Sequence, residues 1–206
     1  MLQFKNMHKF YKSGSHELFF TSDTHFGHKN IIKYCNRPFA SVEEMDEALI
    51  ANWNNKVPTT GIVFVVGDFS MNCPMSRVIS IRERLNGRII LIRGNHDDDV
   101  IKLNEKHKIF EEVHTRLDLR VSYLDEDGNA SYVDIELNHF PSLVWNNSHK
   151  GSYQGFGHVH SKEAIPGQDP FQTDVGVDGN NYTPLSLEDF CNKITKQRME
   201  GMLCSK

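Results

Sequence analysis

The sequence predicts a layered α/β fold around one substantial core, and three observations indicate it. Short apolar runs at residues 18–22, 62–66 and 88–92 are typical of strands, and the run at 62–66 is continuous rather than alternating, as in a strand buried on both faces. Segments with helical spacing of apolar residues lie between these runs. Each run ends in a polar block, where α/β sheets carry their functional loops.

The first half of the chain predicts the order β-α-α-β-α-β. After the first strand, a helix over residues 29–34 ends before the Arg37-Pro38 pair, because a proline disfavours helix in the residue before it. Ser41 and Glu44 form a capping box that starts a second helix. This helix carries apolar residues on one face, namely Met45, Leu49 and Trp53. Residues 74–85 have the spacing of a third helix.

The second half is richer in strands. Residues 117–124 and 131–139 flank the polar segment 125–129, which predicts a hairpin turn. His139 shares its parity with Val133, Ile135 and Leu137, so it continues the inward face of its strand. Further strands are expected at 153–156 and 171–177, and Ser186 caps a last helix through residue 194. We expect a single domain over residues 1–206, with an extension at 1–16 and a tail at 197–206 of unclear structure.

Composition narrows the classes of function. The chain has 206 residues, 38% of them hydrophobic and 24% charged, with a formal net charge of −4, which is ordinary for a soluble globular domain. No run of Lys and Arg indicates a nucleic-acid tail. The four cysteines form no CxxC pair, so we expect free thiols in a reducing compartment. No apolar stretch of ~18 residues and no signal sequence occur, so we expect a cytoplasmic protein without a membrane partner.

Five polar blocks at the ends of predicted strands outline a two-metal hydrolytic site. Asp, His and Asn are ligands suited to Mn²⁺, Fe or Zn²⁺. Pairs of ligands at i and i+2 leave the same face of an extended segment and can hold an ion together. Two cations about 3.5–4 Å apart also need a bridging anion, and Asp68 is the candidate. The candidate ligands are Asp23, His25, Asp68, Asn95, His139, His158 and His160.

His96 has a different predicted role. It follows Asn95 directly, so we expect its ring on the substrate side, where it stabilises or protonates the leaving-group oxygen. Asp97 is the predicted partner that holds the ring and its tautomer, so both are candidate catalytic residues. The expected nucleophile is a metal-bridging hydroxide, whose pKa the ions lower.

These blocks resemble the calcineurin-like metallophosphoesterase family, whose pattern is DxH, GD, GNH(D/E), H and GHxH. The resemblance implies an α/β/β/α sandwich around a dinuclear centre of Mn, Fe or Zn, with Mn favoured in vitro. It implies that two ligand sets each hold one ion. The first ligand set is Asp23, His25, Asp68 and His160. The second ligand set is Asp68, Asn95, His139 and His158.

Two departures from other members of the family bear on the substrate. Phe69-Ser70-Met71 replaces the Asp-Arg-Gly extension of the protein Ser/Thr phosphatase branch, and the chain has no room for the capping domain of the recombination nucleases. The chain is similar to short, stand-alone bacterial and phage members. Several stretches fit that group, namely residues 25–28, residues 36–39, and the late stretch made of residues 175–178 and 182–185.

Three further residues are candidate substrate contacts. His28 lies three residues after His25 and could reach a phosphate, or else cap a helix or face solvent. Arg37 and Arg93 are candidate phosphate clamps, because a guanidinium matches phosphate oxygens in a bidentate way. A surface ion pair is the alternative for Arg93.

We therefore expect a metal-dependent hydrolase of small phosphorylated or nucleotide-like substrates, with a slight lean to phosphodiesters. The absence of a basic tail argues against long duplex nucleic acid as the partner. A nuclease on single strands or RNA ends, a pyrophosphatase, and a non-catalytic binding scaffold of the same fold remain as alternatives. The sequence leaves the oligomeric state open.

Overall fold

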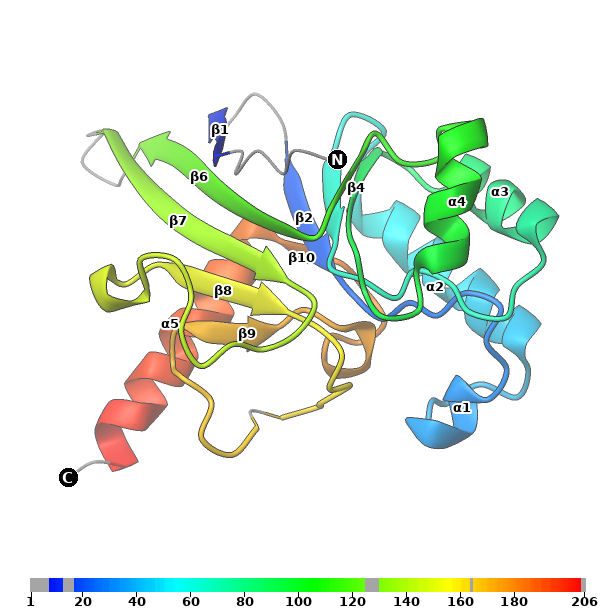
Figure 1. The fold of residues 1–206 in the computed structure, drawn as a ribbon. Coiled ribbons are helices and arrows are strands. Elements are labelled where there is room, and N and C mark those ends of the chain that lie inside the picture. The colour runs from blue at the N-terminus through cyan, green and yellow to red at the C-terminus, as the bar shows by residue number, and fades with distance from the viewer. Residues whose placement is uncertain (1–7, 13–16, 125–129, 164, 205–206) are drawn as a thin grey trace.

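A computed structural model describes residues 8–12, 17–124, 130–163 and 165–204 of the chain. Two five-stranded sheets lie between helices (Figure 1). In the first sheet, β2, β3, β4 and β5 are parallel and β10 is antiparallel to β2. In sheet order its strands are β10 (Leu185–Ser186), β2 (Leu18–Thr21), β3 (Ile62–Val65), β4 (Arg88–Ile92) and β5 (Glu112–His114).

The second sheet combines the N-terminal strand β1 with four strands of the second half of the chain. Its only antiparallel pair among the described strands is β6 with β7, and the other pairs are parallel. In sheet order the strands are β1 (His8–Lys12), β6 (Arg116–Leu124), β7 (Ala130–Asn138), β8 (Tyr153–Phe156) and β9 (Gln172–Asp174).

Helices flank the sheets, and the first four, α1 to α4, pack on one face of the first sheet (Figure 1). The long last helix α5 packs Phe190 against Phe20 of β2, with ring centroids 4.9 Å apart. No helix in the described ranges is both long and apolar enough to cross a membrane. The helices are α1 (Ile31–Tyr34), α2 (Val42–Lys56), α3 (Met75–Arg84), α4 (Asp98–His107) and α5 (Leu187–Cys204), with 3-10 turns η1 (Ser148–Lys150) and η2 (Val177–Gly179).

Strand β3 explains the continuous apolar run at residues 62–66. Val63 and Val65 face the helices, where they pack in one core cluster. Ile62 and Phe64 face the second sheet and belong to the other cluster. Because side chains alternate across a strand, a strand buried on both faces needs apolar residues at every position. The predicted α/β/β/α sandwich is therefore confirmed.

The order β-α-α-β-α-β is confirmed, and so is the Ser41 cap, whose hydroxyl accepts a hydrogen bond from the Glu44 amide. The tail continues α5 to Cys204, and the expected strand at 171–177 shortens to Gln172–Asp174. Strands β1 and β5 were not predicted. The expected hairpin turn at 125–129 lies outside the described residues. Cys35, Cys73 and Cys191 are free thiols, as predicted.

Candidate metal centre

The fold brings the five polar blocks to one place. Strands β2, β3 and β4 are parallel, so their carboxyl ends meet at the same sheet edge. In the second sheet, β7 and β8 are also parallel and deliver their following residues side by side, since the Gly157 amide donates to the His139 carbonyl at 3.0 Å. A backbone bridge between Ser22 and Gly176 joins the two edges. Ligands from both sheets therefore converge between them.

Five of the seven predicted ligands have a backbone conformation that residues other than glycine rarely adopt. Their φ values lie between 49° and 72°: Asp23, His25, Asp68, His158 and His160. Such conformations cost about 1–3 kcal/mol each and concentrate at functional sites. Here they occur in the segments that directly follow β2, β3 and β8.

In the first ligand set, the rings of His25 and His160 lie close to carboxylate oxygens of Asp23 and Asp68. His25 Nε2 lies 3.5 Å from Asp68 Oδ2 and 4.0 Å from Asp23 Oδ1. His160 Nε2 lies 3.7 Å from the same oxygen of Asp23. Both ring nitrogens of His25 and Oδ1 of Asp23 are buried without a hydrogen-bond partner. Unpaired buried polar atoms are costly, so these atoms indicate a bound group that satisfies them.

The second ligand set shares Asp68 with the first. Asp68 Oδ2 lies 3.7 Å from His139 Nε2, and Asn95 Oδ1 lies 3.0 Å from both His139 Nε2 and His158 Nδ1. His139 Nδ1 lies 2.8 Å from the Val66 carbonyl, so that nitrogen carries the proton. Its Nε2 therefore presents a lone pair toward the lone pairs of Asn95. This arrangement suits a cation between them.

The residues thus fit two divalent ions. Asp68 Oδ2 faces both ligand sets, as the bridging carboxylate must. Among the described residues there are three groups of potential ligands whose atoms lie within 4.8 Å of one another inside each group, and two of these groups consist of predicted ligands alone. Those two groups are Asp23, His25 and His160, and Asp23, Asp68 and His139.

The electrostatics of the site agree with cation binding. Burial lowers the pKa of His25 to about 2, so its ring is neutral and available as a ligand. Burial raises the pKa of Asp23 to about 6, since the carboxylate lacks enough nearby positive charge. Burial alone would lower the pKa of His160, but hydrogen bonds with Asp178 and Cys35 and the charge of Asp23 raise it to about 10. A dication would supply the missing positive charge in place of the proton.

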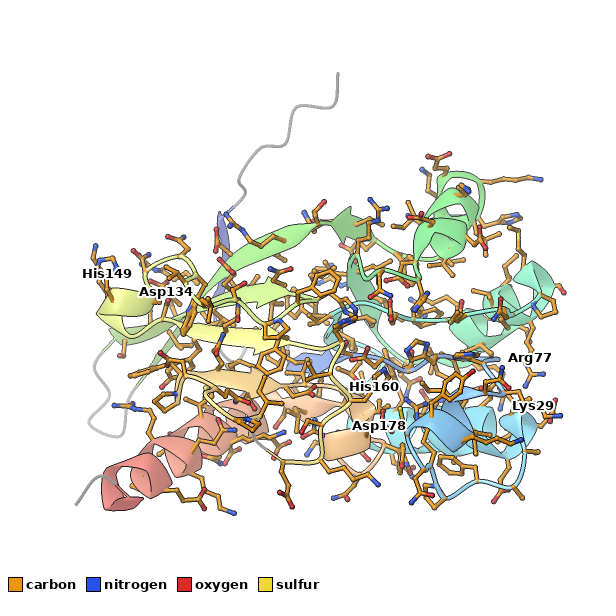
Figure 2. The ribbon with its side chains drawn as sticks, turned by 60° about the horizontal axis from the view of Figure 1, so that its bottom comes forward. Lys29, Arg77, Asp134, His149, His160 and Asp178 are labelled. Atoms are coloured by element: carbon orange, nitrogen blue, oxygen red, sulfur yellow. The ribbon has the colours of Figure 1, made fainter. Side chains whose placement is uncertain are left out.

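Asp178 orients the His160 ring. Its Oδ2 lies 2.8 Å from His160 Nδ1, which leaves Nε2 directed at Asp23. Figure 2 shows His160 and Asp178 beside each other at the meeting of the two sheets. A carboxylate on the outer nitrogen of a ligand histidine fixes its tautomer and raises its basicity. This role of Asp178 was not predicted, although Asp178 lies in a stretch that fits the bacterial and phage group.

The predicted phosphate contact of Arg37 is wrong. Its guanidinium is buried and pairs in a bidentate way with Asp178, at 2.9 and 2.8 Å. The remaining donors go to the carbonyls of Asp23 and Thr24 and to the sulfur of Met45. All five N–H groups are therefore used. Arg37 holds the ligand loop and Asp178 instead of a substrate.

The predicted contact between Asp97 and the His96 ring is also not what the structure shows. The Asp97 carboxylate is fully buried and accepts hydrogen bonds from the backbone amides of Asp68, Phe69 and Gly94, at 2.8 to 2.9 Å. Burial raises its pKa, against those hydrogen bonds. Asp97 therefore ties the loop after β3 to the loop after β4. Within the described residues, its hydrogen bonds all go to backbone.

A cleft of about 470 Å³ opens over both ligand sets. His96 and His28 line it, together with Asn30, Tyr34 and Cys35. His28 is largely buried, and its Nδ1 has no hydrogen-bond partner. Arg93 is not among the residues that line the cleft. Its side chain is 51% exposed and forms an ion pair with Asp98 at 2.6 Å, which is the surface ion pair given as the alternative. The structure thus places His28 with the predicted ligands and Arg93 on the surface.

Comparisons with known proteins agree with this site. The sequence profile described as calcineurin-like phosphoesterase matches residues 17–179, which contain every candidate ligand. An uncharacterized protein, MJ1445, of Methanocaldococcus jannaschii is 34% identical over 89% of this chain and 94% of its own length. The Gene 66 protein of Mycobacterium phage L5 is 31% identical over 86% of this chain and 95% of its own length.

One solved structure is similar in fold. A protein of unknown function from Aquifex aeolicus, AQ665, superimposes with a TM-score of 0.61 and covers 86% of this chain and 99% of its own. Its sequence identity is 22%, so this similarity concerns the fold alone.

Proposed function

Because this chain belongs to the calcineurin-like phosphoesterase family, we propose that it hydrolyses the phosphate ester of a small or nucleotide-like substrate. The family typically binds two divalent metal ions and generally hydrolyses phosphate esters. The observation that carries the proposal is the convergence of unpaired ligand atoms around Asp68. Bound there, two divalent ions would polarise the phosphoryl oxygens and activate a water.

His96 supports the chemistry at the leaving group. Its backbone amide donates to Asp68 Oδ1 at 2.9 Å, which fixes the start of its side chain beside the bridging carboxylate. The centroid of its ring lies 5.9 Å from the centroid of the His25 ring. His96 also lines the cleft. From this position the imidazole would donate a proton to the leaving oxygen.

The cleft supports a compact substrate. Its volume of about 470 Å³ lies in the usual range of small-molecule sites, about 300–1,000 Å³. No Lys or Arg occurs among the described residues that line it, whereas proteins that bind long nucleic acids track phosphates with basic side chains. We lean slightly to phosphodiesters, and a nuclease acting on single strands or RNA ends is the alternative.

The test is hydrolysis of bis-p-nitrophenyl phosphate and p-nitrophenyl phosphate with Mn²⁺, with metal content measured in parallel. We expect Asp68→Asn to lose metal and activity together. We expect His96→Ala to keep metal and lose about 10²–10⁴-fold in rate. His149→Ala is the matched control, because His149 is exposed on η1 and lies far from His160 in Figure 2.

The outcomes separate the candidate functions. Faster cleavage of the diester than the monoester supports the phosphodiesterase assignment. Salt-dependent binding and cleavage of oligonucleotides would favour the nuclease. Bound metal without cleavage of any of these substrates would favour a non-catalytic scaffold and contradict the proposal.

A further inference from the structure

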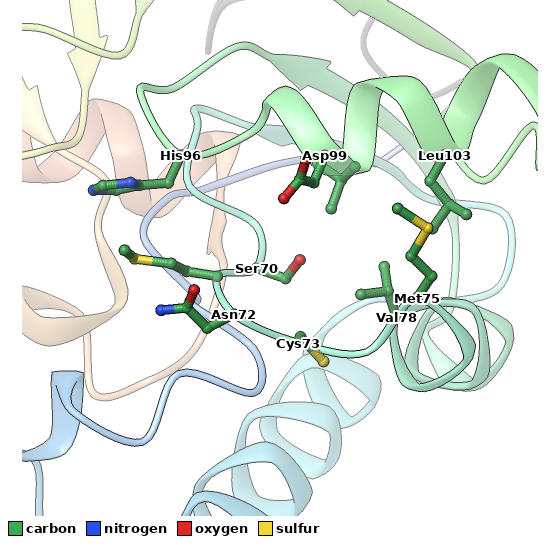
Figure 3. Close-up of a pocket in the computed structure, with 10 residues that line it drawn as sticks. Ser70, Asn72, Cys73, Met75, Val78, His96, Asp99 and Leu103 are labelled. Carbon is green, nitrogen blue, oxygen red and sulfur yellow. The ribbon is translucent and has the colours of Figure 1, made fainter.

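A second pocket adjoins the cleft and shares three residues with it. The pocket has a volume of about 200 Å³. Its shared walls are His96, Met71 and Asn72. Figure 3 shows it between the loop after β3 and helices α3 and α4, with His96 at one end. The group proposed to protonate the leaving oxygen therefore stands where the two cavities meet.

Four apolar side chains are among the remaining walls of this pocket. Met75 and Val78 come from α3, and Val100 and Leu103 come from α4. Met75 is 51% exposed, which is high for a large apolar side chain beside a cavity. Methionine sulfur makes favourable contacts with aromatic rings and adapts to their shape. These four side chains thus offer apolar contacts to the faces of a flat ring.

Besides His96, the pocket has polar groups that carry no positive charge, among them Ser70, Asn72 and Asp99. Ser70 and Asp99 face the space from opposite sides in Figure 3. Asp99 is exposed, with 83% of its side chain accessible, and it stands near Lys102, at 3.7 Å. The described lining contains no Lys or Arg. Lys102 pairs with Asp99 from outside the lining, so a second phosphate or a carboxylate in the pocket would meet the Asp99 carboxylate without a Lys or Arg of the lining beside it.

We propose that this pocket is the leaving-group subsite and that it takes an uncharged planar ring, such as a nucleobase or an aryl group. The inference rests on the proposed function, because it assigns the phosphoryl group to the cleft over the ligands. His96 lines both the cleft and the pocket. The ester oxygen that joins the phosphoryl group in the cleft to the leaving group in the pocket would therefore lie beside the His96 ring. A pocket of about 200 Å³ is smaller than sites for whole drug-sized ligands. It therefore suits a ring rather than a complete nucleotide.

The first test measures binding without catalysis. The full chain is labelled with ¹³C at its methionine methyl groups and titrated with adenosine or with phenol. We expect saturable shifts of the Met71 and Met75 signals, assigned with Met71→Leu and Met75→Leu. Met199, which is 63% exposed on α5, is the internal control and should not shift. The proposal would be overturned if the Met199 signal shifted as much as the Met75 signal. It would also be overturned if neither the Met71 signal nor the Met75 signal shifted. Adenosine acting without phenol would identify a nucleobase, and the reverse an aryl group.

The second test measures leaving-group preference. The two substrates are methyl phosphodiesters of 3-hydroxybenzamide and 3-hydroxybenzoate, which differ in the charge of the leaving group. We expect the wild type to prefer the neutral one. Asp99→Lys should reduce this preference in kcat/KM by about three- to tenfold, since charge reversal replaces repulsion by attraction across a few ångströms of solvent. Glu200→Lys on α5 makes the same change of net charge far from α4 (Figure 1) and is the control.

The outcomes of this test distinguish a failure of the proposed function from a failure of the leaving-group subsite. Cleavage of neither substrate by the wild type contradicts the proposed function itself. Cleavage of both with a preference that Asp99→Lys leaves unchanged contradicts the subsite alone. A reduced preference in Asp99→Lys but not in Glu200→Lys supports it.

Discussion

Replacing Arg37 with alanine should destabilise the protein strongly, because Arg37 joins segments 141 residues apart. Both side chains of the Arg37–Asp178 pair are fully buried, with 0% of either exposed. The variant leaves the Asp178 carboxylate buried without its guanidinium. It also leaves the carbonyls of Asp23 and Thr24 without their donors.

The size of the effect follows from burial. Removing one partner of a buried ion pair costs about 3–5 kcal/mol, because the remaining charge stays in a poorly solvated place. The matched control is Arg84→Ala. Arg84 pairs with Glu47 at 2.5 Å, but its side chain is 45% exposed and that of Glu47 is 61% exposed. An exposed pair contributes at most about 1 kcal/mol, despite its shorter distance.

Urea unfolding of the metal-free protein measures both free energies of unfolding. We expect a much lower midpoint for Arg37→Ala than for Arg84→Ala at a similar m-value. Equal, small losses in the two variants would refute the view that the buried pair holds the ligand loop. Such a result would also reopen a substrate role for Arg37.

Two further predictions concern the ligand loops. Gly67→Ala should weaken Mn²⁺ binding about 10–100-fold in calorimetric titration, since a Cβ there would lie 2.2 Å from His139 Nδ1. Gly167→Ala is its control, because Gly167 also has a positive φ, of 79°, but its Cβ would meet nothing within 4 Å; equal binding in both variants contradicts the prediction. Burial alone would raise the pKa of Asp178, but its hydrogen bonds hold this pKa below the ordinary 3.8. The ionised Asp178 carboxylate therefore stabilises the folded protein above pH 3.8, and this contribution is lost as the pH falls through the pKa of Asp178 in the folded state. The stability difference between wild type and Asp178→Asn in urea should therefore shrink from pH 5 to pH 3, and a constant difference would count against it.

The sequence predicted the parts of the site that depend on local order. Asp23 and His25 stand two residues apart after a buried strand, and so do His158 and His160. Parallel strands align such ends at one edge, so the ligand set could be inferred without knowing the distances. The order of helices and strands along the first half could also be predicted, because apolar period and length distinguish strands from helices there.

The parts that were missed depend on contacts distant in sequence. Arg37 has the same appearance in the sequence whether it binds a phosphate or a buried Asp178, and only the fold brings these two residues together. Asp97 is adjacent to His96 in sequence, yet its carboxylate turns to backbone amides that the β3 and β4 loops leave open. Adjacency in sequence thus misled the assignment of its role.

Strand β1 shows the same limit in the fold. Its residues, His8–Lys12, form a strand only by pairing with β6, more than a hundred residues away. A polar segment without apolar alternation gives no local signal of such pairing. Strand β5 is only three residues long and half-buried, so it carries no recognisable pattern either.

The most direct test of the metal centre is an anomalous difference map from crystals of the Mn²⁺-loaded protein, with Asp68→Asn as the comparison. The account predicts two peaks in the wild type about 3.5–4 Å apart, one beside Asp23 and His25 and the other beside Asn95 and His139, and the loss of peaks in the variant. A single peak away from Asp68, or two peaks that persist in Asp68→Asn, would contradict it.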